Sequence, residues 1–175
     1  MCLNEAVTGM GKGVIKPWAK RLERLPLLES EADDPEIIIT IPFTVGVNIN
    51  SFCIVGSEKD HSPNKVKIFV NRDDIDFDLA RDLTPIHEMD LVEDFVAGID
   101  YPLPPKRFKG VSSITLFIPS NFTGEDEKTM LSYIGFKGEG TAVRRGVVDT
   151  VYEASAQMKD HQKVEGTDNM QSYLT

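Results

Sequence analysis

The sequence has no Cys-x-x-Cys pair, no long apolar run and few cysteines and histidines, the usual ligands of zinc. Its 175 residues include two cysteines, three histidines and one tryptophan. Without a paired cysteine motif, thiol–disulfide exchange of the thioredoxin kind has no reactive group. The longest apolar stretch, residues 37–43, is far shorter than a membrane-spanning helix, and residues 1–5 lack the basic and apolar blocks of a secretory signal. We therefore expect a cytoplasmic protein, with the nucleus as a second location, and no membrane partner.

The two cysteines have different surroundings in the sequence. Cys53 falls inside an apolar strand pattern, where an unpaired cysteine is usually a small core residue. Cys2 is close to the chain terminus, and we expect it to be exposed. A disulfide between them is not expected in a reducing compartment.

Positive charge is scarce, and it forms no stripe along the sequence. The net charge is −9, and ten acidic residues lie between residues 71 and 100, where the only basic residues are Arg72 and Arg81. Such a region repels nucleic-acid phosphates, so we expect no nucleic acid among the partners. Two interpretations remain open: a surface for a basic or neutral protein partner, or a solvated face that keeps the protein soluble.

The N-terminal residues show little regular pattern. Residues 1–15 are rich in glycine, which predicts a flexible, loosely held arm. Trp18, Leu22 and Leu25 follow with the spacing of one short helical stripe between two prolines. We expect Trp18 to pin the arm to the core.

From residue 37 onward, apolar residues alternate with a period of two, which is typical of β-strands. The pattern is clearest at residues 37–41, 66–70 and 114–118, which should contribute to one core. Segments rich in Pro and Gly separate the strands, and almost no helical pattern is visible. The sequence therefore predicts an all-β fold, an antiparallel β-sandwich or jelly roll.

Two irregularities interrupt the strand pattern after residue 41. A turn is predicted around residues 42–46. Beyond it the apolar positions are odd-numbered up to Ile49 and even-numbered from Phe52. A one-residue change of parity is what a β-bulge or bend produces, so we predict one near residues 50–51.

The C-terminal segment, residues 153–175, is mostly polar with scattered apolar residues. Such a segment buries too little to offset its ordering entropy, so it is expected to be flexible or to lie along a surface, its own or that of a partner. The predicted organisation is an arm at 1–15, a β-sandwich at 16–152 and this tail.

No arrangement of residues for catalysis or metal binding is recognisable. The three histidines, His61, His87 and His161, are not spaced with a cysteine or a second histidine as metal ligands are. The acids between residues 29 and 36 lack the spacing and the glycine of an EF-hand loop. No serine stands in a Gly-x-Ser-x-Gly setting. We therefore expect no enzyme, no metal and no cofactor.

Candidate partner contacts lie after the last predicted strand. Arg144 and Arg145 are there, and guanidinium groups bind carboxylates bidentately. Pairing of these arginines with the acidic region of the same chain is the alternative. In the tail, Asp160 and His161 form a polar pair that is a further candidate.

A set of short motifs resembles one protein family. The motifs are Cys-Leu-Asn-Glu at 2–5, Lys-Pro-Trp at 16–18, Glu-Ser-Glu-Ala-Asp at 29–33, Ile-Pro-Phe at 41–43, Val-Lys-Ile-Phe-Val-Asn at 66–71, Ser-Ile-Thr-Leu-Phe-Ile at 113–118 and Tyr-Ile-Gly-Phe-Lys-Gly at 133–138. In this order they resemble the PITH domain, the proteasome-interacting thioredoxin domain, over residues 2–152.

The motifs around Arg144 and at residues 152–161 resemble the stand-alone members of this family, which lack a thioredoxin domain. The resemblance adds Tyr152 to the candidate contacts. It implies a jelly-roll sandwich similar to galactose-binding domains, no catalytic residues, and a link to the proteasome regulatory particle. Relatives carry further residues, including an apolar segment, before the motif at 2–5. Either a terminal strand is missing, which would expose a sheet edge, or this member dispenses with that strand.

These observations predict a non-catalytic protein-binding domain, a monomeric adaptor or cofactor of the proteasome regulatory particle. The alternative is a small-ligand, carbohydrate-like binder that uses the loops at one end of the sandwich. An aromatic content of 8% with a single tryptophan argues against a sugar-stacking surface.

Overall fold

Strand β3, Ile37–Gly56, is the longest element and connects the two layers of the fold. The computed structural model describes residues 1–57, 60–124 and 127–144, with side chains through residue 141. The other elements are β1 (Cys2–Leu3), α1 (Met10–Gly13), the 3-10 helix η1 (Trp18–Lys20), β2 (Leu28–Glu29), β4 (Lys65–Val70), α2 (Phe77–Asp82), β5 (His87–Asp90), β6 (Tyr101–Pro102), β7 (Val111–Ile118) and β8 (Met130–Arg144).

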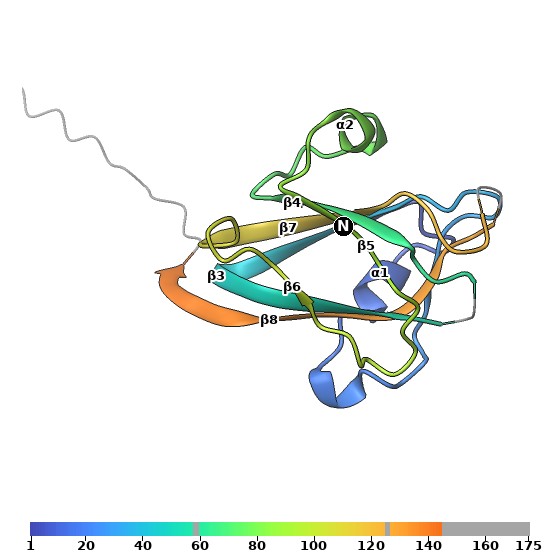
Figure 1. Ribbon diagram of the computed structural model, residues 1–175, viewed down its shortest axis with the longest axis horizontal. Helices are drawn as coiled ribbons and strands as arrows, with labels where there is room; N and C mark the ends of the chain where they lie inside the picture. The colour runs from blue at the N-terminus through green and yellow to red at the C-terminus, as the bar shows by residue number, and fades with distance from the viewer. Residues whose placement is uncertain (58–59, 125–126, 145–175) are drawn as a thin grey trace, which may run out of the picture. The chain divides into compact units, whose positions relative to one another are not determined.

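The two halves of β3 pair with different strands, always antiparallel. Residues 37–42 lie opposite residues 113–118 of β7, and residues 47–56 lie opposite residues 131–140 of β8. The strand order is β2-β8-β3-β7-β4-β5, with β1 and β6 also paired to β3. Figure 1 shows β4 and β7 in one layer and β6 and β8 in the other. The antiparallel β-sandwich predicted from the sequence is confirmed.

The irregularities of β3 differ in part from those expected. The predicted bulge is present, since the register with β8 shifts between Ile49 and Ser51. The predicted turn at residues 42–46 is wrong, because β3 continues through it. Instead, the register with β7 shifts between Pro42 and Val47. Bulges bend a strand, so β3 leaves one layer and enters the other here without a turn.

The main core lies between the layers. Ile39 is 2% exposed, and Ile68 and Leu116 are fully buried in the same cluster, as their alternation predicted. Complete burial of each such side chain stabilises the fold by roughly 1.5–3 kcal/mol. Phe52 and Phe108 are also fully buried in this cluster.

Helix α2, which the sequence analysis did not predict, covers the other face of β7. Its N-cap is Asp76, whose carboxylate accepts a hydrogen bond from the backbone N–H of Leu79 at 2.8 Å. Ala80 of this helix belongs to a second buried cluster with Ile38 and Phe117. Strands buried on both faces are continuously apolar, which explains three successive isoleucines at the start of β3.

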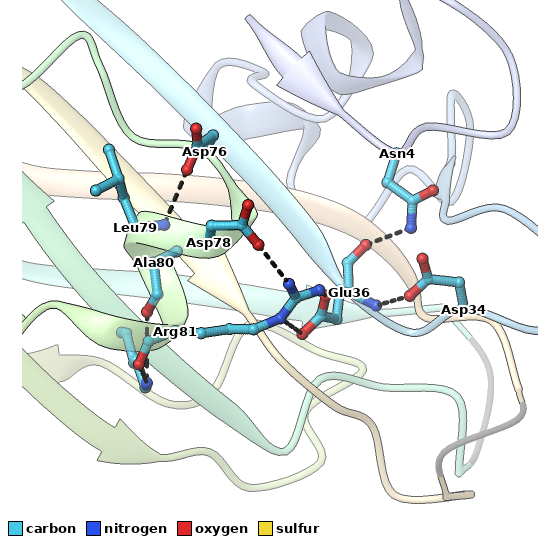
Figure 2. Close-up of polar contacts among 9 residues, drawn as sticks. Asn4, Asp34, Glu36, Asp76, Asp78, Leu79, Ala80 and Arg81 are labelled. Atoms are coloured by element: carbon cyan, nitrogen blue, oxygen red, sulfur yellow. Dashed lines mark hydrogen bonds and ion pairs between the residues drawn. The ribbon is translucent and has the colours of Figure 1, made fainter.

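Arg81 connects α2 to the segment before β3 (Figure 2). Its guanidinium donates to both carboxylate oxygens of Glu36, with Nε to Oε1 at 3.1 Å, and to Asp78 at 3.3 Å. Asn4 donates to the carbonyl of Glu36 at 2.6 Å, so the residues after β1 join the same cluster. Lys137 of β8 pairs with Asp100, so part of the acidic charge of residues 71–100 is neutralised within the chain.

The N-terminal segment contacts the sheet, which corrects the loose arm predicted for residues 1–15. β1 pairs with β3, and the carbonyl of the fully buried Val14 accepts a hydrogen bond from Ile134 at 2.9 Å. Cys2 is half-buried, whereas the sequence analysis placed it in solvent. Its side chain lies against Gly11, where an added Cβ would meet the Cys2 Cβ at 2.5 Å. Glycine therefore permits close packing at this position.

Candidate functional site

A small cluster of side chains on the outer face of β3 and β8 points away from the core. Alternation sends Ile54 and Ile134 into the core and Cys53, Val55 and Tyr133 to the other side. These outward side chains are only 2–3% exposed. They are buried because two segments from distant parts of the sequence lie over this face.

The first covering segment follows α1 and contains η1. Lys16 Nζ donates to the carbonyls of Glu23, at 2.6 Å, and Leu25, at 3.2 Å, and so closes the segment into a loop. Desolvation lowers the pKa of Lys16. The predicted helical stripe is wrong: only a single 3-10 turn forms, and Trp18, Leu22 and Leu25 are 45%, 55% and 74% exposed. The segment thus presents apolar side chains to solvent.

The second covering segment is the loop between β5 and β6, organised around a buried carboxylate. Asp94 is 5% exposed and accepts hydrogen bonds from the backbone of Val96, at 2.9 Å, and Ile99, at 2.8 Å. Ala97 of this loop packs against the cluster of Cys53. In Figure 1, this loop and η1 both lie on the side of β8 that faces away from β4 and β7.

Trp18 is at the centre of the contacts on this face. Its ring meets Tyr133 edge-on, with centroids 6.3 Å apart and planes at 70°. The Arg21 guanidinium lies 4.3 Å and Lys137 Nζ 4.9 Å from the Trp18 ring centroid. Lys137 also forms an ion pair with Asp100. Cation–π contacts contribute about 0.5–1 kcal/mol each at exposed sites, so they orient the ring while leaving it accessible.

A hollow of about 490 Å³ lies beside Trp18. Phe43, Tyr133 and Phe136 contribute further aromatic surface to it, and Lys16, Asp100 and Lys137 provide its charged groups. Gly135 makes this arrangement possible, because a Cβ at that position would overlap the Tyr133 hydroxyl. Burial raises the pKa of Tyr133 above its ordinary value. The hollow can therefore receive a large apolar group with charged groups beside it.

A second hollow, of about 640 Å³, lies between α1 and β3. It is lined by Cys2, Glu5, Ile39 and Ile41, among others, and no aromatic side chain contributes to it. Because aromatic and arginine side chains dominate binding energy in interfaces, this hollow is the weaker candidate.

The residues proposed from the sequence as partner contacts lie at or beyond the end of the described part of the chain. The backbone of Arg144 ends β8 opposite Val45, so this residue is within the strand and not after it. The side chain of Arg144 and the whole of Arg145, Tyr152, Asp160 and His161 lie outside the described residues. Their role in partner binding stays a prediction.

The two described histidines make structural contacts: His61 a hydrogen bond and His87 a ring contact. His61 Nδ1 lies 3.0 Å from the carbonyl of Lys128, and His87 packs edge-on against Phe108. In the part of the chain that the structure describes, no group of three His, Cys, Asp or Glu side chains is arranged to hold a metal. Nor do residues 1–57, 60–124 and 127–144 contain a helix long and apolar enough to cross a membrane.

Both thiols are in environments that suppress their reactivity. Burial raises the pKa of Cys53 to about 11, with Asp94 adding to the effect, and raises that of Cys2 to about 12, with Glu5 adding to it. The thiolate is the nucleophile, and it is scarce in both residues at neutral pH. Cys53 is buried, as its strand pattern predicted.

Solved structures of low sequence similarity share this fold. The C-terminal domain of a chitobiase from Bacteroides fragilis superposes with a TM-score of 0.53 at 16% identity, covering 81% of this chain and 92% of that one. CBM32-3 from a family 31 glycoside hydrolase of Clostridium perfringens gives a TM-score of 0.53 at 12% identity, with coverages of 79% and 88%. Identities this low show the fold alone. The protein is a β-sandwich of the galactose-binding-like class.

The sequence relatives narrow this class to one family. The PITH domain model matches residues 1–156. PITH domain-containing protein 1 of Dictyostelium discoideum is 38% identical over 91% of this chain and 78% of its own length. The human protein of the same name is 35% identical, with coverages of 91% and 74%. A PITH domain-containing protein of Drosophila melanogaster is 40% identical, with coverages of 93% and 75%. The chain belongs to the PITH domain family, as its motifs indicated.

The sequence analysis missed the face around Trp18, although a local signal was present. The only tryptophan of an acidic chain is flanked by Lys16, Lys20, Arg21 and Arg24. A tryptophan among cations is unusual for a core residue, and this could have indicated surface exposure. The contribution of Tyr133 and Lys137 depends on the pairing of β3 with β8 and could not be read locally.

Proposed function

We propose that this chain is a non-catalytic, monomeric protein-binding domain of the cytosol or nucleus, whose partner is the proteasome regulatory particle. The observation that carries the binding function is the exposed Trp18 beside an aromatic hollow, with Arg21 and Lys137 over its ring. Tryptophan, tyrosine and arginine are the residues most enriched in interface hot spots. The family resemblance supports the choice of partner.

Both covering segments expose further apolar side chains. Leu22 and Leu25 are exposed on the first, and Val92 and Val96 are 61% and 68% exposed on the second. Grouped apolar side chains rimmed by polar residues mark interaction sites more often than isolated ones do. The buried cluster beneath them holds both segments in place, so little ordering entropy is lost on binding.

Carbohydrate binding is the second candidate, favoured by the fold shared with CBM32-3. A sugar would have to stack on an exposed aromatic ring, and Trp18 is the largest one available. Two cations already lie over that ring, so a stacked sugar would compete with them for contact with it. This geometry favours a protein partner. Titration with a panel of monosaccharides and disaccharides, followed by Trp18 fluorescence, distinguishes the two candidates.

The test is capture of purified proteasome regulatory particle by the immobilised full chain. We expect the wild-type chain to retain the particle and Trp18→Ala to weaken capture by about tenfold or more, as hot-spot truncations do. The matched control is Phe122→Ala, which removes another exposed aromatic side chain, 42% exposed, that does not line the hollow.

Thermal unfolding of each variant separates loss of binding from loss of fold. Equal capture by Trp18→Ala and wild type would overturn the role of this face. Failure of the wild-type chain to retain the particle would overturn the choice of partner.

A further inference from the structure

The segment that forms one side of the hollow is basic, although the chain as a whole is acidic. Residues 12–24 contain Lys12, Lys16, Lys20, Arg21 and Arg24 against the single acid Glu23, while the net charge of the chain is −9. We propose that the hollow beside Trp18 binds a short acidic segment of a partner protein that carries one or two large apolar side chains. The inference rests on the proposed function, because it names the chemistry of the partner at the same face.

The apolar part of the ligand is indicated by the lining of the hollow. Trp18, Phe43, Tyr133 and Phe136 all contribute to it, and Ile15 adds aliphatic surface. A volume of about 490 Å³ is within the range of pockets that accept small organic groups. One or two large side chains of a peptide fill such a space and bury apolar area against aromatic rings.

The acidic part of the ligand is indicated by cations that retain donor capacity. Among the described residues, the Arg21 guanidinium makes one hydrogen bond, from Nη1 to the carbonyl of Trp18 at 3.2 Å, and its Nε is buried without a partner. Arg24 does not line the hollow but belongs to the same basic segment, is exposed, and forms no hydrogen bond or ion pair with the described part of the chain. A guanidinium offers five N–H donors and favours carboxylates. Peptide carboxylates would bind the remaining Nη donors of Arg21 and the guanidinium of Arg24 while the apolar side chain enters the hollow.

Other occupants fit these observations less well. A nucleic acid would be repelled by the net charge of the chain and would gain nothing from an aliphatic wall. A second copy of this chain and its own residues 145–175 both contain acids, so each is a distinct outcome of the test.

The experiment selects peptides without assuming their sequence. A random dodecapeptide phage library is panned in parallel on the full chain and on its Trp18→Ala variant. We expect the peptides enriched on the wild type alone to be rich in Asp and Glu, poor in Lys and Arg, and to contain a Leu, Ile or Phe. A selected peptide free of tryptophan is then titrated, with fluorescence of Trp18, the only tryptophan of the chain, as the readout.

Charge reversal tests the role of the cations directly. Arg24→Glu with Lys137→Glu should weaken binding of the selected peptide by about tenfold or more, because opposite charges steer and hold the ligand. The control is Lys106→Glu with Lys109→Glu, which changes the net charge equally on an exposed loop outside the hollow and should leave affinity within about twofold. Higher salt should weaken the peptide complex. Unfolding curves verify that both variants are folded.

Several results would overturn the inference. Panning could enrich basic or uncharged peptides, or could give no enrichment that depends on Trp18. Deleting residues 157–175 could change Trp18 fluorescence in the absence of any peptide, or the chain could self-associate in a way that depends on Trp18. If capture of the regulatory particle requires Trp18 but is unchanged by the charge reversal at Arg24 and Lys137, the proposed function stands and this inference fails. If the acidic peptide binds while the particle does not, the inference stands and the partner proposed above is wrong.

Discussion

Leu116 of β7 lies directly opposite Ile39 of β3, and both side chains are buried in the core between the two layers. On its other side, Leu116 is the partner of Ile68 in β4. Leu116 therefore lies between two neighbouring strands, β3 and β4, and its packing depends on segments that are almost 80 residues apart in the sequence.

Leu116→Ala should destabilise the protein by about 2–5 kcal/mol, because it removes a fully buried side chain and leaves a cavity. The matched control is Leu25→Ala, at a leucine that is 74% exposed, where the change should stay within about 0.5 kcal/mol. Urea unfolding followed by circular dichroism measures both. Equal destabilisation by the two variants would contradict the assigned core.

Gly138→Ala should destabilise the protein by about 1–3 kcal/mol, because overpacking forces the strands apart. A Cβ at this position would overlap the carbonyl oxygen of Asn48 on the neighbouring strand. Gly140→Ala, two residues along the same strand, is the control: its Cβ would meet nothing closer than Val45 Cγ2 at 3.6 Å. Unchanged stability of Gly138→Ala would show that the close approach of β3 and β8 is wrong.

Cys53 should make the protein less stable at alkaline pH. Its pKa is 9.0 in an unperturbed thiol and about 11 in the fold. The unfolded chain therefore releases this proton first, and stability falls as the pH rises from about 9 to about 11. Urea unfolding between about pH 9 and about pH 11 should show a smaller fall in the free energy of unfolding for Cys53→Ala than for the wild type. An equal fall in the free energy of unfolding for the two proteins would contradict the raised pKa of Cys53.

The same thiols should be unreactive in the native state. Near neutral pH, labelling of Cys2 and Cys53 by a disulfide reagent should be slow in buffer and fast in denaturant. Insulin reduction should stay at background, and Cys53→Ala should change stability without changing partner capture. An insulin-reduction activity that disappears in Cys53→Ala would overturn this expectation.

The C-terminal residues provide a separate prediction about binding. Deleting residues 157–175 should leave the melting temperature almost unchanged and weaken capture of the regulatory particle, because polar segments with separated apolar residues often order on a partner. Arg144→Ala with Arg145→Ala should also weaken capture, and more so at low salt. Unaltered capture would indicate an inert tail, and a large fall in melting temperature would indicate a structural role.

The sequence by itself determined the strands and the fold class. Alternation at residues 37–41, 66–70 and 114–118 reports which side chains face a core, and that property is local because successive residues of a strand point to opposite faces. The change of parity after Ile49 gave the bulge for the same reason. The motif set also determined the family, which the relatives confirm.

Only the tertiary structure decided which segments of the chain pair or pack against one another. Residues 42–46 look like a turn locally, yet Val45 pairs with Arg144, a hundred residues later, and this pairing keeps the strand extended. The glycine-rich N-terminal segment is fixed by contacts with β3, and Tyr133 and Lys137 of β8 hold the half-exposed ring of Trp18 against the sheet. Composition describes how freely a segment can move. Burial against distant residues decides where it is held and which of its side chains remain available to a partner.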